Sequence, residues 1–216
     1  MKKIPIAMLG ALLLPLSLLS QEVGTDPKNH DNWQVRIRGL AIAPDEDASI
    51  ESIGGEVDIS TAVIPELDFT YFFTEHWAAE LILGTSKHDV EAIGTAAGNM
   101  DLGHVWLLPP TLTLQYHITG QKLRPYLGAG INYTLFYGSD EGPVADGVDY
   151  ENSTGLALQL GVDYELGNHW FLNMDLKKIF LSTDATIDAN TVLGATVGAE
   201  VDIDPLLVGI GLGYRF

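Results

Sequence analysis

The chain alternates apolar and polar side chains with a period of two along eight separate stretches. In the first stretch, WQVRIRGLAIA, apolar residues share one face while Gln34, Arg36 and Arg38 share the other. A period of two is typical of a β-strand whose two faces meet different environments. The eight stretches cover residues 33–43, 65–73, 77–85, 105–118, 124–138, 154–166, 170–180 and 206–216. The alternation therefore predicts an all-β fold.

The connections between these stretches alternate between long and short. The short ones are Thr74–His76, Thr119–Lys122 and Gly167–His169. The long ones are polar segments at about 45–55, 87–103, 139–152 and 182–204. Bacterial outer-membrane barrels have an even number of antiparallel strands, short periplasmic turns and longer outer loops. We therefore predict an eight-stranded antiparallel transmembrane β-barrel with short periplasmic turns and long extracellular loops.

The first 20 residues differ from the rest of the chain. A basic start, MKK, precedes the apolar run IPIAMLGALLLPLSLLS. This order predicts a secretory signal peptide at residues 1–20, cleaved near Ser20, followed by a single barrel domain at residues 21–216. The alternative is a membrane-anchoring helix. Pro5, Pro15 and the short length of the run disfavour it, since a span needs about 20 apolar residues.

Periodicity alone leaves open which face of the barrel is the inside. The export signal, the alternating connections and the aromatic residues beside the short turns favour lipid outside and charges inside. The alternative is a soluble periplasmic barrel with charges outside. On the favoured orientation, the inward charged side chains are Arg36, Arg38, Glu66, Glu80, Asp163, Glu165, Asp175, Lys177 and Arg215. Because eight strands leave an interior that side chains fill, we expect a plug of ion pairs; the alternative is a charge-selective channel.

Further along the strands the inward positions become apolar. Leu40 and Ile42 follow the two arginines of the first stretch, and Val105 and Leu107 begin the fourth. Pro109 and Pro110 come next, and proline removes a donor from the strand ladder. These six residues predict an apolar pocket with a lateral opening in the wall. The alternative is a plain bulge near the rim.

Charge and composition exclude several kinds of partner and site. The chain has 29 acidic and 11 basic residues, and phosphate contacts need clustered Lys and Arg, so we expect no nucleic-acid binding. It has no cysteine, and no acidic run matches the spaced calcium-loop pattern, so we predict no metal and no cofactor. The acidic segments predict a solvated surface; the alternative is binding of divalent cations shared with lipopolysaccharide.

The chain is not expected to be an enzyme. Ser86, His88, His104 and Ser139 are present, but no serine stands beside a histidine and an acid in a known triad order or elbow. The last strand ends in Tyr214 and Phe216, and it must pair with the first strand to close the barrel. A terminal aromatic residue resembles the signal that the barrel assembly machinery recognises.

Several stretches resemble the outer-membrane protein W (OmpW) family, across nearly all of the chain outside the signal peptide and the long connections. They are WQVRIRGLAIAP, PELDFTYFFTEHWAAEL, LGHVWLLPPTLTLQYHI, RPYLGAGINYTLFY, LGVDYELGNHWFLNMDLKK and GYRF. The resemblance implies an eight-stranded barrel in the outer membrane of a Gram-negative bacterium. It also implies a narrow lumen that moves small hydrophobic molecules, and use as a receptor by phage or bacteriocins. Asp175 and Lys177 on the inward face depart from the apolar constriction found in family members.

The sequence therefore predicts a narrow passive channel for small hydrophobic molecules with lateral exit into the membrane. Its expected partners are outer-membrane lipid, lipopolysaccharide, the barrel assembly machinery and small hydrophobic ligands. The alternative is a structural, adhesin or receptor barrel that acts through its acidic extracellular loops. A lipid-A-modifying enzyme is a more distant third reading.

Overall fold

The computed structural model describes residues 31–50, 54–96, 98–141, 147–189 and 195–216. Residues Asp31–Phe216 form one compact unit. The predicted signal peptide at residues 1–20 lies outside the described residues, as do 51–53 and 142–146 of the acidic segments. Within the described ranges, no helix has the length and apolar character needed to cross a membrane.

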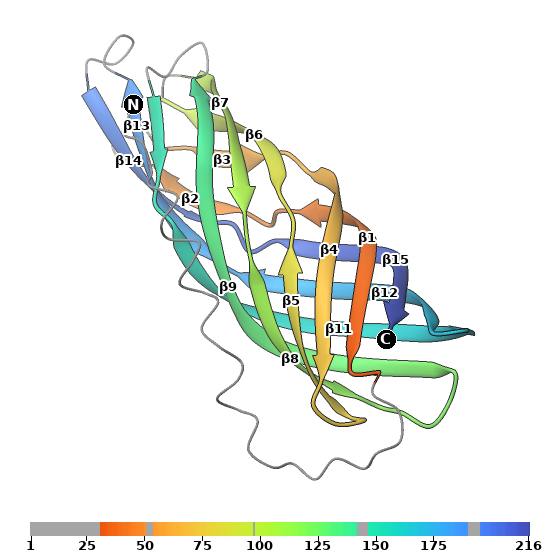
Figure 1. Cartoon of the computed structure of the whole chain (residues 1–216). Coiled ribbons are helices and arrows are strands. Elements are labelled where there is room, and N and C mark those ends of the chain that lie inside the picture. The colour runs from red at the N-terminus through yellow and green to blue at the C-terminus, as the bar shows by residue number, and fades with distance from the viewer. Residues whose placement is uncertain (1–30, 51–53, 97, 142–146, 190–194) are drawn as a thin grey trace. The chain divides into compact units, whose positions relative to one another are not determined.

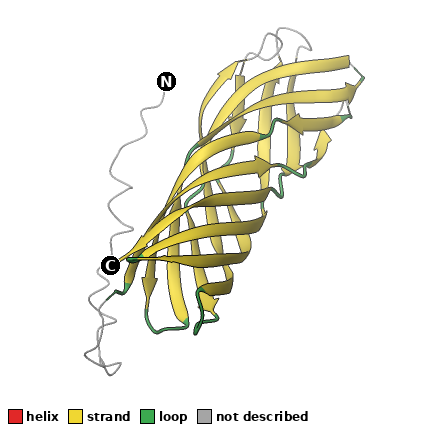
Figure 2. Cartoon of the chain, turned by 90° about the vertical axis from the view of Figure 1, so that its right-hand side faces the viewer, coloured by secondary structure: helices red, strands yellow, loops and turns green. Residues whose placement is uncertain are grey.

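Eight strands form a closed antiparallel barrel, as predicted (Figures 1 and 2). They are β1 (Trp33–Ala43), β4 (Ala62–Phe72), β5 (Trp77–Leu83), β8 (Thr111–His117), β9 (Leu123–Glu141), β11 (Ser153–Gly167), β12 (Trp170–Phe180) and β15 (Leu206–Arg215). The last strand pairs with the first, from Leu206 opposite Ala43 to Arg215 opposite Gln34. This pairing closes the sheet, so the barrel has no free edge.

Seven further strands lie in or next to the segments that were predicted as long loops. They are β2 (Asp47–Ile50), β3 (Glu56–Ile59), β6 (Ser86–Thr95), β7 (Gly98–Leu108), β10 (Gly147–Tyr150), β13 (Ser182–Ala189) and β14 (Ala195–Asp202). One of them, β7, includes residues 105–108 of the stretch that was predicted as a single strand at 105–118. They extend the wall at the end opposite the short turns (Figure 1). On β6 the outward residues Lys87, Asp89 and Glu91 are charged while Val90 and Ala92 are buried. The strands form because this alternation continues, and the charges place them beyond the lipid.

The short connections lie where the alternation predicts them. The β11–β12 turn consists of Asn168 and His169, with φ of 51° and 68°. Positive φ at both central residues is the geometry of a type I′ hairpin turn, whose twist matches that of the flanking strands. Three tight turns therefore connect the barrel strands at one end of the barrel.

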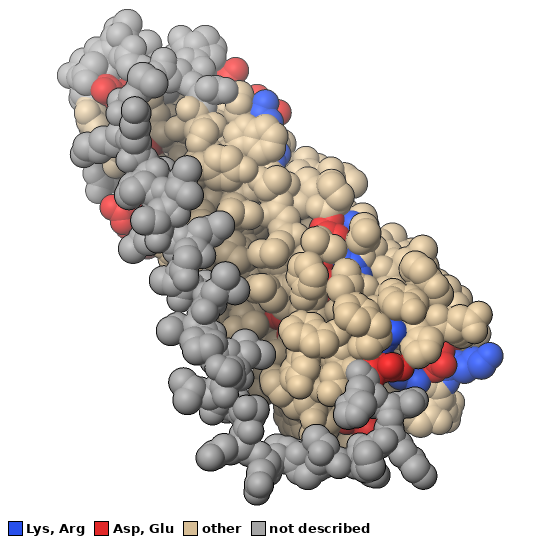
Figure 3. All heavy atoms as spheres, viewed as in Figure 1, with Lys and Arg blue, Asp and Glu red and all other residues tan. Residues whose placement is uncertain are grey.

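The outer surface of the barrel is a belt of exposed apolar side chains. Leu127, Leu160 and Ile210 are 57%, 59% and 55% exposed. Beside the short turns, aromatic rings from neighbouring strands meet, such as Trp170 and Tyr214 at 5.1 Å between centroids. Figure 3 shows that most of the visible wall carries neither acidic nor basic atoms. Such a surface is stable in hydrocarbon, so lipid lies outside and the charges lie inside, as predicted.

A charge placed in the middle of the belt should destabilise the barrel more than one at its edge. We expect Leu160→Arg to lower the free energy of unfolding by about 2–4 kcal/mol. Tyr164→Arg, four residues nearer the turn on the same face of β11, should cost about 0–1 kcal/mol. Urea unfolding in phospholipid vesicles, followed by tryptophan fluorescence, measures both. Equal costs at the two positions would contradict the assignment of the belt.

Candidate functional site

Charged side chains from five barrel strands meet in the middle of the lumen. They are Arg36 and Arg38 of β1, Glu66 and Asp68 of β4, Glu80 of β5, Asp163 of β11, and Asp175 and Lys177 of β12. Each of these residues is 4% exposed or less. We call this group the ion cluster. Seven of its eight members were predicted for the lumen charge network, and Asp68 was not.

The contacts in the ion cluster are close and shared. Arg36 Nη1 lies 2.6 Å from Glu80 Oε1, and Arg38 Nε lies 2.6 Å from Glu66 Oε1. Arg38 Nη2 also reaches Glu80 Oε1, at 3.3 Å. Lys177 Nζ forms an ion pair with Asp175 and lies 3.7 Å from Glu66 Oε1. Each cation therefore faces more than one carboxylate, as buried charges require.

Amide and hydroxyl groups donate hydrogen bonds to several of the carboxylate oxygens. Among the described residues the ion cluster has three cations and five carboxylates. Glu80 Oε2 accepts hydrogen bonds from Gln115 Nε2 at 2.8 Å and Gln159 Nε2 at 2.7 Å. Asp175 Oδ2 accepts one from the Tyr126 hydroxyl at 2.7 Å. These side chains fill the cross-section with hydrogen-bonded groups, which favours a plug over a charge-selective channel.

A row of glycines on β15 makes room for the two arginines. A Cβ on Gly211 would lie 2.7 Å from Arg38 Cγ and 2.1 Å from the Ile37 carbonyl oxygen. A Cβ on Gly213 would lie 2.9 Å from Arg36 Cγ. The arginine stems therefore lie directly against the neighbouring strand. The sequence pattern places these glycines inward, and only the pairing of β15 with β1 shows why they are needed.

Two predicted members of the charge network lie outside the ion cluster, nearer the short turns. Glu165 accepts from Arg124 Nη2 at 2.7 Å, and the two side chains are 36% and 26% exposed. Arg215 Nε donates to the Asp31 carbonyl at 2.7 Å, and its guanidinium lies 3.8 Å from the centre of the Phe72 ring. Both face inward as the alternation predicts, but they lie at the mouth of the barrel.

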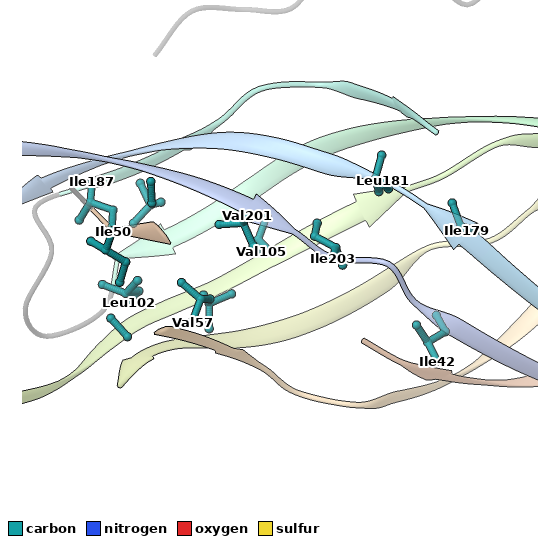
Figure 4. Close-up of a cluster of buried hydrophobic side chains, with 14 of the residues drawn as sticks. Ile42, Ile50, Val57, Leu102, Val105, Ile179, Leu181, Ile187, Val201 and Ile203 are labelled. Atoms are coloured by element: carbon teal, nitrogen blue, oxygen red, sulfur yellow. The ribbon is translucent and has the colours of Figure 1, made fainter. Parts of the chain in front are cut away.

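An apolar cavity of about 70 Å³ lies beyond the ion cluster, among the strands that extend the wall (Figure 4). We call it the chamber. Of the six residues predicted for a pocket and opening, the chamber is lined by Ile42, Val105, Leu107 and Pro109. The other two do not line it. Leu40 is 3% exposed and belongs to the apolar cluster around the chamber. The Pro110 carbonyl accepts a hydrogen bond from the Tyr133 amide.

Much of the chamber wall comes from the segments that were predicted as loops. The lining residues from β3, β6, β7, β10, β13 and β14 include Val57, Val90, Leu102, Val148, Ile187 and Val201. Their signal was present, because apolar residues alternate with charged or polar ones in these segments. The charges on the outward positions led to the prediction of solvated loops.

The wall beside the chamber has a break in its hydrogen-bonded ladder. Ile82 of β5 pairs with Thr111 of β8, and Ser86 of β6 pairs with Leu107 of β7, with three unpaired positions between them on each side. The register is the same on both sides of this gap, so it is not a bulge, which would add a residue to one strand. Pro109 and Pro110 have no N–H to donate. The Pro109 carbonyl instead accepts from Asn132 Nδ2 at 3.3 Å.

Ser86 and His88 form a hydrogen-bonded pair in the chamber wall, which also includes Thr134 and Thr183. The Ser60 carbonyl lies 2.6 Å from His88 Nδ1 and can only accept, so Nδ1 carries a hydrogen. Burial lowers the pKa of His88, which keeps the ring neutral, and Nε2 therefore accepts from the Ser86 hydroxyl at 3.0 Å. The histidine is held by a backbone carbonyl where a catalytic triad would have a carboxylate. His104 and Ser139 lie elsewhere, on β7 and β9.

Removing one cation from the ion cluster should strongly destabilise the barrel. Arg38→Met leaves several buried carboxylates without their partner, and we expect a loss of about 3–5 kcal/mol in the free energy of unfolding. Arg124→Met breaks a partly exposed pair at the mouth and should cost about 1 kcal/mol or less. Urea unfolding in detergent micelles compares the two variants. Similar small losses for both would show that the ion cluster is hydrated.

Comparison with known proteins agrees with this architecture. A family model described as the OmpW family matches residues 29–216. The chain is 48% identical over 186 residues to the uncharacterized outer-membrane protein y4mB of Sinorhizobium fredii, covering 85% of this chain and 80% of that protein. It is 32% identical over 194 residues to the dibenzothiophene metabolism operon protein PahQ of Pseudomonas aeruginosa, covering 85% and 88%.

Comparison with a solved structure supports the same fold and family. The crystal structure of the outer membrane protein OprG from Pseudomonas aeruginosa matches with a TM-score of 0.79 and 30% sequence identity, covering 86% of this chain and 95% of that one. The protein is therefore a β-barrel of the Gram-negative outer membrane, and it belongs to the OmpW family.

Proposed function

We propose that the protein is a passive conduit for small hydrophobic molecules, which enter the chamber from outside the cell and leave sideways into the membrane. The observation that carries this proposal is the position of Pro109, which lines the chamber and interrupts the ladder of its wall. An apolar molecule in the chamber therefore lies beside the weakest part of the wall. Leu107 and Ser86, on either side of the break, also line the chamber.

The ion cluster supports lateral exit over passage along the barrel axis. Moving an apolar molecule past it would separate buried ion pairs that lie at 2.6–3.7 Å. Breaking such a pair is costly when no water replaces the lost partner. Lateral exit needs only the parting of two strands that already lack ladder bonds at the break.

The ligand class follows from the chamber and is supported by one relative. The lining is almost wholly aliphatic or aromatic, which favours compact apolar molecules. PahQ is named for a dibenzothiophene metabolism operon, and dibenzothiophene is an apolar aromatic compound. No catalytic step belongs to the proposal, because the Ser86–His88 pair is oriented by a carbonyl.

The second candidate is a structural, adhesin or receptor barrel that acts through its outer segments. The charged outward positions of β6 favour it, since they present an acidic and basic surface beyond the lipid. It does not account for an apolar chamber beside a break in the wall. Recognition of Tyr214 and Phe216 by the assembly machinery, and contact with lipopolysaccharide, remain predictions; both aromatic residues are exposed on the outer face.

A disulfide lock across the break tests lateral exit. The register places Thr85 opposite Leu108. The natural chain has no cysteine, so two introduced cysteines can pair only with each other. We expect oxidised Thr85→Cys/Leu108→Cys protein to lose most of its uptake of radiolabelled naphthalene, and a reductant to restore it. The control is Leu81→Cys/Leu112→Cys, a directly opposed outward pair within the intact ladder, whose oxidation should change nothing. If the lock leaves uptake unchanged, molecules do not leave through the break.

A further inference from the structure

Two side chains bridge the break on the lipid-facing surface of the wall. The Thr85 hydroxyl donates to the Leu107 carbonyl at 3.0 Å. Because that hydrogen is used, the Tyr137 hydroxyl must donate to Thr85 Oγ1, and the two oxygens lie 2.5 Å apart. Thr85 and Tyr137 are both exposed on the outer side of the wall. Ser86 and Pro109, which line the chamber, lie on the inner side of the wall.

The chain of hydrogen bonds crosses a whole strand. Tyr137 belongs to β9, where it pairs with Trp106 of β7, while Thr85 links β5 to β6 on the other side of β7. The centroid of the Tyr137 ring lies 6.4 Å from that of the Trp106 ring. The Tyr137 side chain therefore crosses β7 and bonds to the segment between β5 and β6. This contact lies at the break, where Pro109 and Pro110 donate no backbone hydrogen bond.

We infer that Thr85 and Tyr137 form a latch that sets how often the break opens toward the lipid, an inference that rests on the proposed lateral exit. Ladder bonds between backbones open only when strands separate along their length. A side-chain bond opens by rotation of one or two χ angles, which takes picoseconds to nanoseconds for exposed residues. Placing side-chain bonds where the ladder is missing makes this the point of the wall that opens with the least disruption.

The latch also bears on which molecules pass. The Tyr137 hydroxyl and Thr85 Oγ1 stand at the outer side of the break, and each can bond a polar group of a departing molecule once the latch is open. The chamber behind them is apolar. The geometry therefore fits compact apolar molecules that carry one hydroxyl or amine, such as phenols, in addition to pure hydrocarbons.

Removing the latch should increase lateral exit. A hydrogen bond of this kind contributes a net stabilisation that corresponds to about a two- to tenfold change in an equilibrium. We expect Thr85→Val and Tyr137→Phe each to raise the rate of naphthalene uptake by about that factor. Thr85→Val removes both bonds of the latch, whereas Tyr137→Phe leaves the bond from Thr85 to the Leu107 carbonyl, so the double variant should gain little over Thr85→Val alone.

Matched controls separate the latch from general loosening. Thr85→Ser keeps the hydroxyl and should behave as the wild type. Tyr133 is another exposed tyrosine on β9, and its hydroxyl makes no hydrogen bond with the described residues, so Tyr133→Phe should also leave uptake unchanged. Hydrogen–deuterium exchange should rise at Gly84–Ser86 in the two latch variants and stay constant in the controls.

The outcomes distinguish failure of the latch from failure of the proposed function. If Thr85→Val and Tyr137→Phe leave both exchange and uptake unchanged while the disulfide lock blocks uptake, molecules exit laterally but the latch does not control them. If exchange rises and uptake does not, and the lock also has no effect, the latch holds the wall and the conduit proposal is wrong. A decrease in uptake in either variant overturns the latch.

Discussion

The ion cluster fills the middle of the lumen, and the proposed function depends on this constraint. Hydrocarbon outside the wall requires every backbone group to be paired within a closed sheet, and eight strands leave an interior that side chains fill. Here the filling is charged: Arg36 and Arg38 face five carboxylates together with Lys177, with almost no exposure to solvent. A buried network of this kind is stable only as a complete set. In the proposed function, the path of an apolar molecule therefore ends at this level.

The rest of the molecule is arranged around that barrier. Gly211 and Gly213 let the arginine stems lie against β15, which holds their head groups in the middle of the lumen. Beyond the ion cluster, the strands that extend the wall enclose an apolar chamber, and their outward charges place it outside the lipid. The weakest part of the wall lies between these two levels, at Pro109 and Pro110. The proposed storage of an apolar molecule and its proposed release sideways would thus use adjacent parts of the same structure.

The alternation of side chains predicts the barrel strands and divides each of them into two faces, because a period of two is a local property. It places Arg36, Arg38, Asp175 and Lys177 on one face, and the export signal, the alternating connections and the aromatic residues beside the short turns assign that face to the inside. It does not give depth along the barrel, which depends on tilt and register, so Glu165 and Arg215 could not be separated from the ion cluster. It also missed the chamber walls, because the charges beside Val90 were interpreted as solvated loop. The contact of Tyr137 with Thr85 crosses an intervening strand, and no spacing along the chain encodes it.

The most direct measurement of this account is the position of a bound apolar molecule. Crystals of the protein soaked with 1-bromonaphthalene would show the bromine by anomalous diffraction. The account predicts an anomalous peak in the chamber, near Leu107 and Pro109. A peak between the ion cluster and the short turns, below Arg38, would show that apolar molecules pass along the axis, and it would contradict the division of the lumen on which the proposed function depends.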